Sequence, residues 1–447
     1  MSRSNSLPQQ ALTNLLHFTL QDRITGVLIG SALGDTIGLY TEFLSSTQAK
    51  SSYPTSKFTL HPTPTPFKLD RHRAPFTPGH WTDDTDHALL LLLSFLHNSS
   101  ASSSNISSPT QTDFAERLRI WVSQGFKPLD TMPLGLGRLV GTVLTSKGFD
   151  ADPEKIAREY WEGTGRKAAP NGSLMRTHPL GLITLWEEEE RCFEVAAGIS
   201  RATHVDPRCV IACVVGGGLV RGLVRGEVHT EQDVEGLIER GKKWYESVGK
   251  QEGYPHVDWA ELDNYTSGKG GLEGLKLDDQ HAIGYVYKAL GAGVVLLRMA
   301  MKRNHGLLDR VSLFEELTTE LVMHGGDADT NACFAGALLG GYLGFAALPD
   351  HWKHGMVHGK WLVRKAEAVC QILDVKEGDY TGQDDPDTAP LGGKPAVSQQ
   401  DMEGKWMVFQ QETMRKMDEA KKAEEAKTAE SHSKSGWSAP WKKAKKQ

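Results

Sequence analysis

The chain has 447 residues and a formal net charge of −6 at pH 7, and the residues Ala, Val, Ile, Leu, Met, Phe, Trp, Tyr and Cys make up 39% of it. This balance is that of a globular protein with a sizeable core, and it lacks the basic field that nucleic-acid binding requires. The longest uninterrupted apolar runs are too short to cross a bilayer, so no membrane association is expected.

Cysteine usage and the N-terminal sequence indicate an intracellular protein, in the cytoplasm and/or the nucleus. The five cysteines are few and odd in number, and most lie in apolar stretches. They are therefore expected to be reduced and buried. No Cys-x-x-Cys pattern is present, which argues against a thiolate zinc site. The first 20 residues lack the long apolar segment of a signal peptide.

The N-terminal part of the chain alternates between polar segments and one apolar segment. Residues 1–19 are expected to be disordered, and residues 24–40 are apolar and rich in small side chains, which favours a buried helix interrupted near Gly34. Residues 44–80 carry Ser, Thr and Pro without a clear period and are predicted to form a long loop. A serine-rich, low-complexity insert follows at 98–112.

Helical patterns dominate the remainder, and alternating strand patterns are nearly absent. The predicted helices are 88–96, 114–123, 153–162, 182–199, 208–224, 231–248, 282–301, 313–323 and 331–345. The fold class is therefore predicted as all-α, with one compact domain over 20–375. Residues 376–447 are predicted to form a flexible charged tail that contains a helix over 403–430 and ends in a lysine-rich stretch.

Two acidic segments directly precede apolar helices: Trp-Thr-Asp-Asp-Thr-Asp at 81–86 and Gly-Gly-Asp-Ala-Asp-Thr-Asn at 325–331. Helix capping needs one side chain, whereas each segment supplies several carboxylates. Crowded, half-buried carboxylates repel one another unless a cation neutralises them, and oxygen ligands suit Mg²⁺ or Mn²⁺ rather than zinc. We therefore predict two such ions, held by Thr82, Asp83, Asp84, Asp327, Asp329 and Thr330.

Three further segments are weak signals when taken singly. Glu42 follows a glycine-bearing turn, although an isolated glutamate in a loop is usually solvated. The segment 171–176 (Asn-Gly-Ser-Leu-Met-Arg) contains a glycine that lets the backbone approach a ligand, as turns around phosphates do. Thr203-His204 precedes an apolar helix, where a lone histidine is more often structural.

In this order, the segments resemble the ADP-ribosylglycohydrolase family over about residues 20–365, and Pro349 and Trp352 match a proline and a tryptophan that commonly follow. The resemblance implies a single-domain, all-α fold with a binuclear Mg²⁺ or Mn²⁺ centre at the base of a cleft. It places the six predicted ligands on the family's metal positions. It also implies that Glu42 lies near the scissile bond on a mobile segment, and Glu42 and Asp84 are the candidate catalytic residues.

The same resemblance implies that Asn171, Gly172, Ser173 and His204 contact ADP-ribose. The expected activity is hydrolysis of the glycosidic bond between ADP-ribose and a protein side chain or small acceptor, by a monomer that binds no nucleic acid directly. The alternatives are a binuclear-metal hydrolase of another ADP-ribose derivative or phosphoester, and a non-catalytic binding or structural protein on the same fold. The presence of all six ligand residues argues against a degenerate metal site.

Glycine is in excess, at 46 of 447 residues, and six of the 46 lie within 325–344. Gly325 and Gly326 are expected to turn the chain so that Asp327 and Asp329 face one site. The other four, together with the alanines, predict a helix that packs closely against a neighbour behind the metal site.

Overall fold

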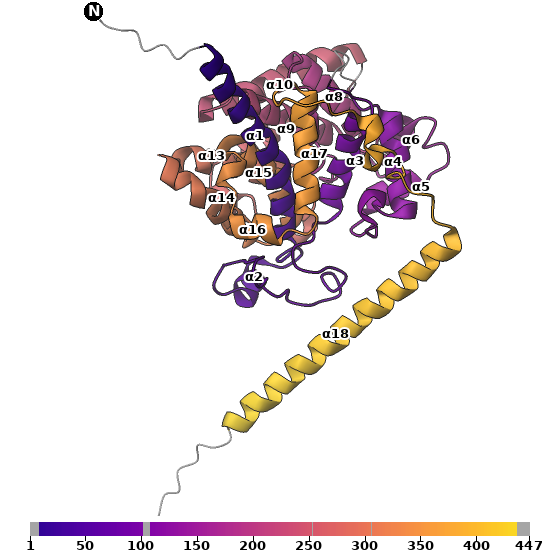
Figure 1. Ribbon diagram of the computed structural model, residues 1–447, viewed down its shortest axis with the longest axis vertical. Helices are drawn as coiled ribbons and strands as arrows, with labels where there is room; N and C mark the ends of the chain where they lie inside the picture. Colours follow the sequence, from indigo (N-terminus) through magenta and orange to yellow (C-terminus); the bar gives the residue numbers. More distant parts are fainter. Residues whose placement is uncertain (1–8, 102–107, 253, 305, 436–447) are drawn as a thin grey trace, which may run out of the picture. The chain divides into compact units, whose positions relative to one another are not determined.

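Helices make up the regular structure of the protein. A computed structural model describes residues 9–101, 108–252, 254–304 and 306–435, and within these ranges extended residues pair only in four isolated bridges (Figure 1). The all-α prediction is confirmed. Residues 1–8, the centre of the serine-rich insert (102–107) and the lysine-rich end (436–447) lie outside the described residues.

The helices follow one another in this order: α1 (Gln9–Gly38), α2 (Ser46–Ser52), α3 (Asp83–His97), α4 (Gln111–Gln124), α5 (Arg138–Thr145), α6 (Pro153–Gly163), α7 (His178–Ile183), α8 (Glu189–Arg201), α9 (Pro207–Arg225), α10 (Glu231–Glu252), α11 (Trp259–Thr266), α12 (Gly271–Gly274), α13 (Val286–Arg303), α14 (Leu307–Val322), α15 (Ala328–Leu343), α16 (Asp350–Gly355), α17 (Gly359–Ile372) and α18 (Gln399–Ser435). Short 3₁₀ helices lie at Lys127–Leu129, Gln280–Ala282, Phe345–Ala347, Gly382–Asp384 and Pro386–Thr388.

The chain divides into two compact units. The first contains Met1–Thr65 and Pro78–Ala396, and the second contains Pro66–Thr77 and Val397–Gln447. Within the second unit, α18 is one helix of 37 residues that spans the predicted helix 403–430. All the predicted site residues belong to the first unit.

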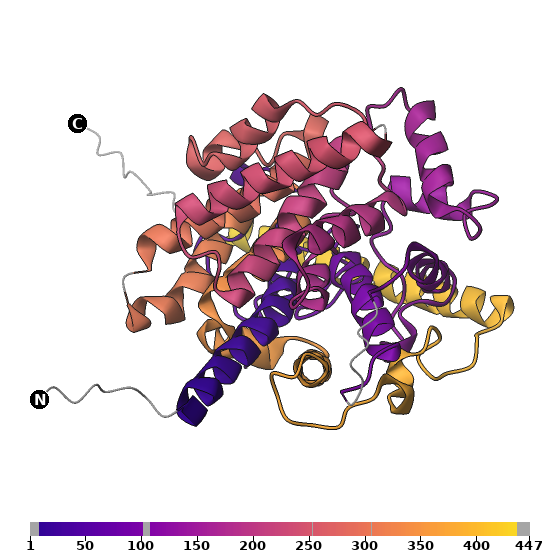
Figure 2. The same cartoon turned by 90° about the horizontal axis from the view of Figure 1, so that it is seen from above.

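The centre of the first unit is the crossing of α1 and α15, which lie side by side in Figure 1. Figure 2 shows α1 running into the middle of the surrounding helices, and its residues from Gly26 to Gly38 are all buried. Glycines recur along this face of α1, and a Cβ added to Gly26 or Gly30 would lie 2.2 or 2.5 Å from a backbone oxygen of α15. The prediction that the glycines of α15 serve close helix packing is therefore confirmed, and α1 is the helix that they contact.

Two helix predictions are wrong, and residues 9–19, which were expected to be disordered, form the start of α1. First, α1 continues without interruption through Gly34, because Gly34 marks the close approach to α15 rather than a turn. Second, the single helix predicted over 182–199 is two helices, α7 and α8, with a break at 184–188. The run of glutamates at 187–190 explains the break, because acidic side chains stabilise a helix N-terminus more than a helix interior.

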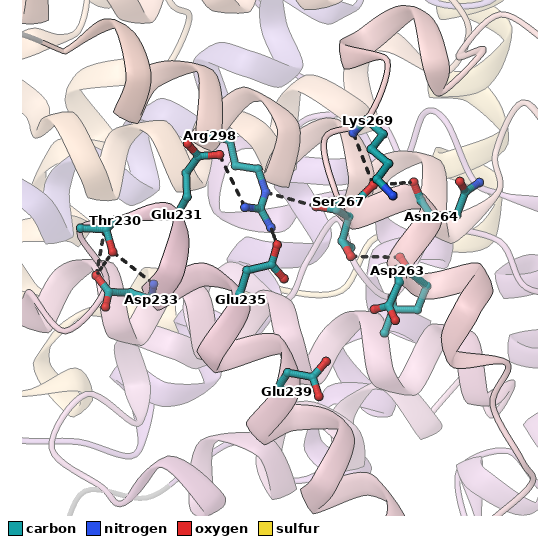
Figure 3. Close-up of polar contacts among 12 residues, drawn as sticks. Thr230, Glu231, Asp233, Glu235, Glu239, Asp263, Asn264, Ser267, Lys269 and Arg298 are labelled. Carbon is teal, nitrogen blue, oxygen red and sulfur yellow. Dashed lines mark hydrogen bonds and ion pairs between the residues drawn. The ribbon is translucent and has the colours of Figure 1, made fainter.

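Buried Arg298 on α13 ties α10 and α11 to this core, as Figure 3 shows. Its guanidinium contacts Glu235 at 2.8 Å and Glu231 at 3.7 Å, and its Nε donates to the carbonyl oxygen of Thr266. An arginine with several partners can remain charged when buried, so Arg298 and its partners have a structural role and connect α10 and α11 to α13.

One described helix, α9, is long and apolar enough to span a membrane by length and composition alone. In its most apolar window, 94% of the residues are buried inside the protein. Such burial is typical of a core helix.

Candidate active site

Three helix ends meet where the acidic segments lie: the C-terminal end of α1 and the N-terminal ends of α3 and α15. Asp35 of α1 joins the first two. Its carboxylate accepts hydrogen bonds from the backbone N–H groups of Thr82 at 3.0 Å and of Thr85 at 3.1 Å, and from the Thr85 hydroxyl at 2.6 Å. Asp35 therefore caps α3 from a different helix and fixes the segment that carries Asp83 and Asp84.

The predicted ligands of α3 and α15 lie next to one another. The Thr82 hydroxyl is 3.1 Å from Asp84 Oδ2 and 3.4 Å from Asp329 Oδ2. Hydrogen bonds from Thr330 counteract the rise in the pKa values of Asp84 and Asp327, which links the two segments again. Two motifs 244 residues apart in sequence thus share one site.

Glu42 lies in the same cluster, since Glu42, Asp327 and Asp329 each offer a carboxylate oxygen and these atoms lie within 4.8 Å of one another. The turn before α15 holds the backbone after Glu42. The N–H of Phe43 donates to the Gly326 oxygen at 2.6 Å, and the N–H of Gly326 donates to the Leu44 oxygen at 2.9 Å. Glu42 is buried, with 5% of the residue exposed.

The left-handed turn at Gly325 and Gly326 is what permits this approach, because both residues have positive φ, at +67° and +73°. A Cβ on Gly325 would lie 2.1 Å from the Leu44 oxygen, so a larger residue would push the Glu42 segment away. The predicted turn is therefore present, and it positions Glu42 as well as the two aspartates.

The carboxyl groups of the site perturb one another. Burial first, and neighbouring carboxylates second, raise the pKa values of Asp83, Asp84 and Asp329 well above the ordinary aspartate value. Burial and the charge of Glu42 raise the pKa of Asp327 to about 6. Like charges this close are unfavourable without a counter-charge, and after burial the largest cause of each of these pKa shifts is a neighbouring carboxylate.

The donor set fits a hard divalent cation. All its ligand atoms are carboxylate or hydroxyl oxygens, and Asp84 Oδ1 is buried with no hydrogen-bond partner in the part of the chain that the structure describes. A cation would satisfy that oxygen and relieve the repulsion that raises the pKa values. The acidic cluster can therefore hold a metal ion.

The predicted ADP-ribose residues do not all lie in one place. Asn171 adjoins the acidic cluster, and its Nδ2 donates to Asp327 Oδ2 at 2.8 Å. Gly172 lies against the imidazole of His204, because an added Cβ would be 3.2 Å from the ring. Ser173 is fully buried, and its hydroxyl pairs with Ser200 at 3.1 Å inside the protein.

Arg176 connects the 171–173 turn to His204. It is fully buried, donates to the Gly172 oxygen at 3.0 Å and to the Thr203 hydroxyl at 2.8 Å, and packs over the ring of Phe114. Burial and this guanidinium lower the pKa of His204 well below its usual range, so His204 is neutral at pH 7. Sequence reasoning quoted Arg176 within its motif but gave it no role.

Two glycines at the site were missed. A Cβ on Gly135 would lie 2.0 Å from Asp83 Oδ1, and one on Gly284 would lie 3.2 Å from Asp327 Oδ2. Gly135 has a φ of +93° and lies in a connection between α4 and α5 that carries no acidic motif. The only sequence signal for a role of this connection is that Gly135 and Gly137 stand beside apolar residues.

Comparisons with known proteins agree with this arrangement. Residues 17–381 match the protein family described as ADP-ribosylglycohydrolase. The chain is 24% identical over 350 residues to ADP-ribosylarginine hydrolase Tri1 of Serratia proteamaculans, which covers 78% of this chain and 79% of that protein. It is also 24% identical to the ADP-ribosyl-[dinitrogen reductase] glycohydrolase of Rhodospirillum rubrum, over 75% of this chain and 90% of that protein.

A solved structure described as an ADP-ribosylglycohydrolase-related protein complex has the same fold. It superposes with a TM-score of 0.51 at 22% identity and covers 79% of this chain and 99% of that one. The family match includes most of α1 and all of α3 and α15, and it ends before residues 382–447. Since it covers well over half of the chain, the protein belongs to the ADP-ribosylglycohydrolase family.

Proposed function

We propose that the protein hydrolyses the glycosidic bond between ADP-ribose and a protein side chain or small acceptor, and that it uses two Mg²⁺ or Mn²⁺ ions. The observation that carries the proposal is the joined cluster of oxygen ligands at the N-terminal ends of α3 and α15, where carboxylate oxygens of Glu42, Asp327 and Asp329 lie within 4.8 Å of one another. So many carboxylates in one buried site repel one another, and divalent cations would relieve that repulsion. The relatives that act on ADP-ribosyl groups supply the substrate class.

In the proposed reaction, water adds to the anomeric carbon of the ribose as the bond to the acceptor breaks. Bound divalent cations supply Lewis-acid activation of that water and orientation of the ribose hydroxyls. Glu42 moves the protons: it accepts one from the water and returns one to the leaving atom of the acceptor. Asp84 contributes the negative charge that stabilises an oxocarbenium-like transition state.

The rest of ADP-ribose is proposed to lie along the turn at 171–172 and His204. Neutral His204 can offer one ring nitrogen to a ligand, since its Nδ1 already pairs with the Thr203 hydroxyl at 2.7 Å. Gly172 keeps the backbone close to this ring. Arg176 acts through these residues as a positioning group.

The test is release of free ADP-ribose from a panel of arginine-, serine- and polymer-linked substrates and O-acetyl-ADP-ribose, with Mg²⁺, Mn²⁺ or EDTA. We expect one class to be cleaved, and we expect Asp327→Ala and Asp329→Ala to lose at least about a thousandfold in kcat/KM, the scale of electrostatic stabilisation by a preorganised site. Asp350→Ala is the matched control, because the Asp350 side chain is 83% exposed and lies on α16. Tight ADP-ribose binding without turnover on any substrate would instead identify a binding protein.

A further inference from the structure

The segment Gly382–Ala396, here called the C-terminal strap, follows the part of the chain that matches the family. It is anchored on α17 through charged groups. Lys365 Nζ lies 2.6 Å from Asp385 and 3.0 Å from Asp387, and Trp361 Nε1 donates to Asp387 at 2.7 Å. The Lys365 side chain is only 6% exposed, so removing its aspartate partners would leave a buried charge without compensation.

The strap next contacts the C-terminal end of α3 and the middle of α4. The hydroxyl of Thr388 pairs with His97 Nδ1 at 3.0 Å, and buried Arg117 donates to the Thr388 carbonyl oxygen at 2.9 Å. At its beginning, the N–H of Gly382 donates to the Ser99 oxygen at 3.0 Å. These bonds hold the strap against the C-terminal end of α3, the helix that presents Asp83 and Asp84 at its other end.

The end of the strap contacts the connection between α4 and α5. Lys127 Nζ donates to the Pro395 oxygen at 2.9 Å, although Lys127 is 4% exposed. Lys394 Nζ reaches the Pro128 oxygen at 3.3 Å and pairs with the Asp130 carboxylate. The two backbones touch here, since a Cβ on Gly392 would lie 2.7 Å from the nitrogen of Pro128.

This connection leads directly to the acidic site. Phe126 and Thr131 close a tight loop through the N–H of Phe126 and the oxygen of Thr131, at 2.9 Å. Four residues later, Gly135 lies against the carboxylate of Asp83. A displacement of 126–131 therefore moves the backbone that borders a predicted metal ligand.

We propose that the C-terminal strap is a positioning element, which holds the loop 126–137 against the N-terminal end of α3 and thereby sets the affinity for the substrate. Its effect on affinity rests on the proposed hydrolase function, whereas its effect on the loop does not. The loop borders Asp83, a proposed ligand of the ions that orient the ribose hydroxyls, so a displaced loop weakens substrate binding.

The test combines two strap variants of the full-length protein with one matched control. Gly392→Ala forces the strap and residues 127–128 apart, and Lys394→Ala removes the ion pair and the bond to Pro128. The control is Lys376→Ala, because Lys376 is 36% exposed, the same as Lys394, but pairs with Glu367 on α17. Hydrogen exchange of peptides over 126–137 reports on the loop, and steady-state kinetics report on affinity.

We expect about tenfold faster exchange over 126–137 in Gly392→Ala, with a smaller increase in Lys394→Ala and none in Lys376→Ala. For the cleaved substrate, Lys394→Ala should raise KM about threefold to fivefold with kcat within about twofold, and Lys394→Arg should restore it. Unchanged exchange in Gly392→Ala and Lys394→Ala overturns the proposal even if the protein is not a hydrolase. Faster exchange with an unchanged KM overturns the effect on affinity.

Discussion

The close crossing of α1 and α15 makes Gly34→Ala the most informative stability variant. A Cβ at residue 34 would lie 1.9 Å from the Ala332 oxygen, where ordinary contacts begin at 3.4 Å. The helices would have to separate by about 1.5 Å, and the atom met is backbone, which cannot rotate away. Overpacking costs about 1–3 kcal/mol, and this case belongs at or above the upper end, so we expect a loss of about 3 kcal/mol or more in the free energy of unfolding.

The matched control is Gly198→Ala in α8, where a Cβ would meet nothing within 4 Å. Alanine is the better helix former, so Gly198→Ala should stabilise the protein by about 0.5–1 kcal/mol. Urea unfolding of the two variants and the unmodified protein, followed by circular dichroism, measures both changes. A Gly34→Ala protein as stable as the unmodified one would refute the account of the glycine-mediated crossing.

Three further predictions concern the site and its surroundings. Mg²⁺ should raise the melting temperature more at pH 7 than at about pH 5. The reason is that Asp327, whose pKa is raised to about 6, must lose its proton to bind a cation. A Mg²⁺-dependent rise in melting temperature that becomes smaller as the pH increases would contradict this. Asp86→Asn should lower the free energy of unfolding by about 1–3 kcal/mol. Each carboxylate oxygen of buried Asp86 accepts from one tryptophan N–H group at 2.9 Å, and in asparagine one of these oxygens becomes an NH2 donor that faces an N–H group; denaturant titration checks this. Arg176→Lys should raise KM about tenfold and leave Mn²⁺ affinity unchanged, because lysine cannot bond to Gly172 and Thr203 together. Equal losses of substrate affinity and Mn²⁺ affinity would make Arg176 a general stability residue.

The site residues that could be predicted from the sequence are those that lie in contiguous motifs. Thr82, Asp83 and Asp84 stand together before one helix, and Asp327, Asp329 and Thr330 stand together before another, so the chemistry of crowded oxygens is visible without a fold. The glycine-rich face of α15 was equally visible. Its partner on α1 was not, because the four-residue spacing from Gly26 to Gly38 gains meaning only when the two helices meet.

The rest of the site depends on tertiary approach. Gly135 borders Asp83 and Gly284 borders Asp327, yet neither glycine belongs to an acidic or charged pattern. Asp35 follows Gly34 in an apolar segment and carries no sequence signal of its own, whereas the structure makes it the cap of a helix whose N-cap residue lies 47 residues away. Residues 376–396 have the composition of a tail, but the segment packs through the pairing of Lys365 with Asp385, which no local pattern predicts.

The most direct test of the central claim is the number of Mn²⁺ ions that the protein binds, measured by electron paramagnetic resonance of free Mn²⁺ at pH 7.5. The account predicts two saturable sites per chain in the unmodified protein and in Asp350→Ala, and loss of at least one in Asp329→Ala. Absence of saturable binding in the unmodified protein, or full binding in Asp329→Ala, would contradict the claim that the acidic cluster at the N-terminal ends of α3 and α15 forms a metal centre.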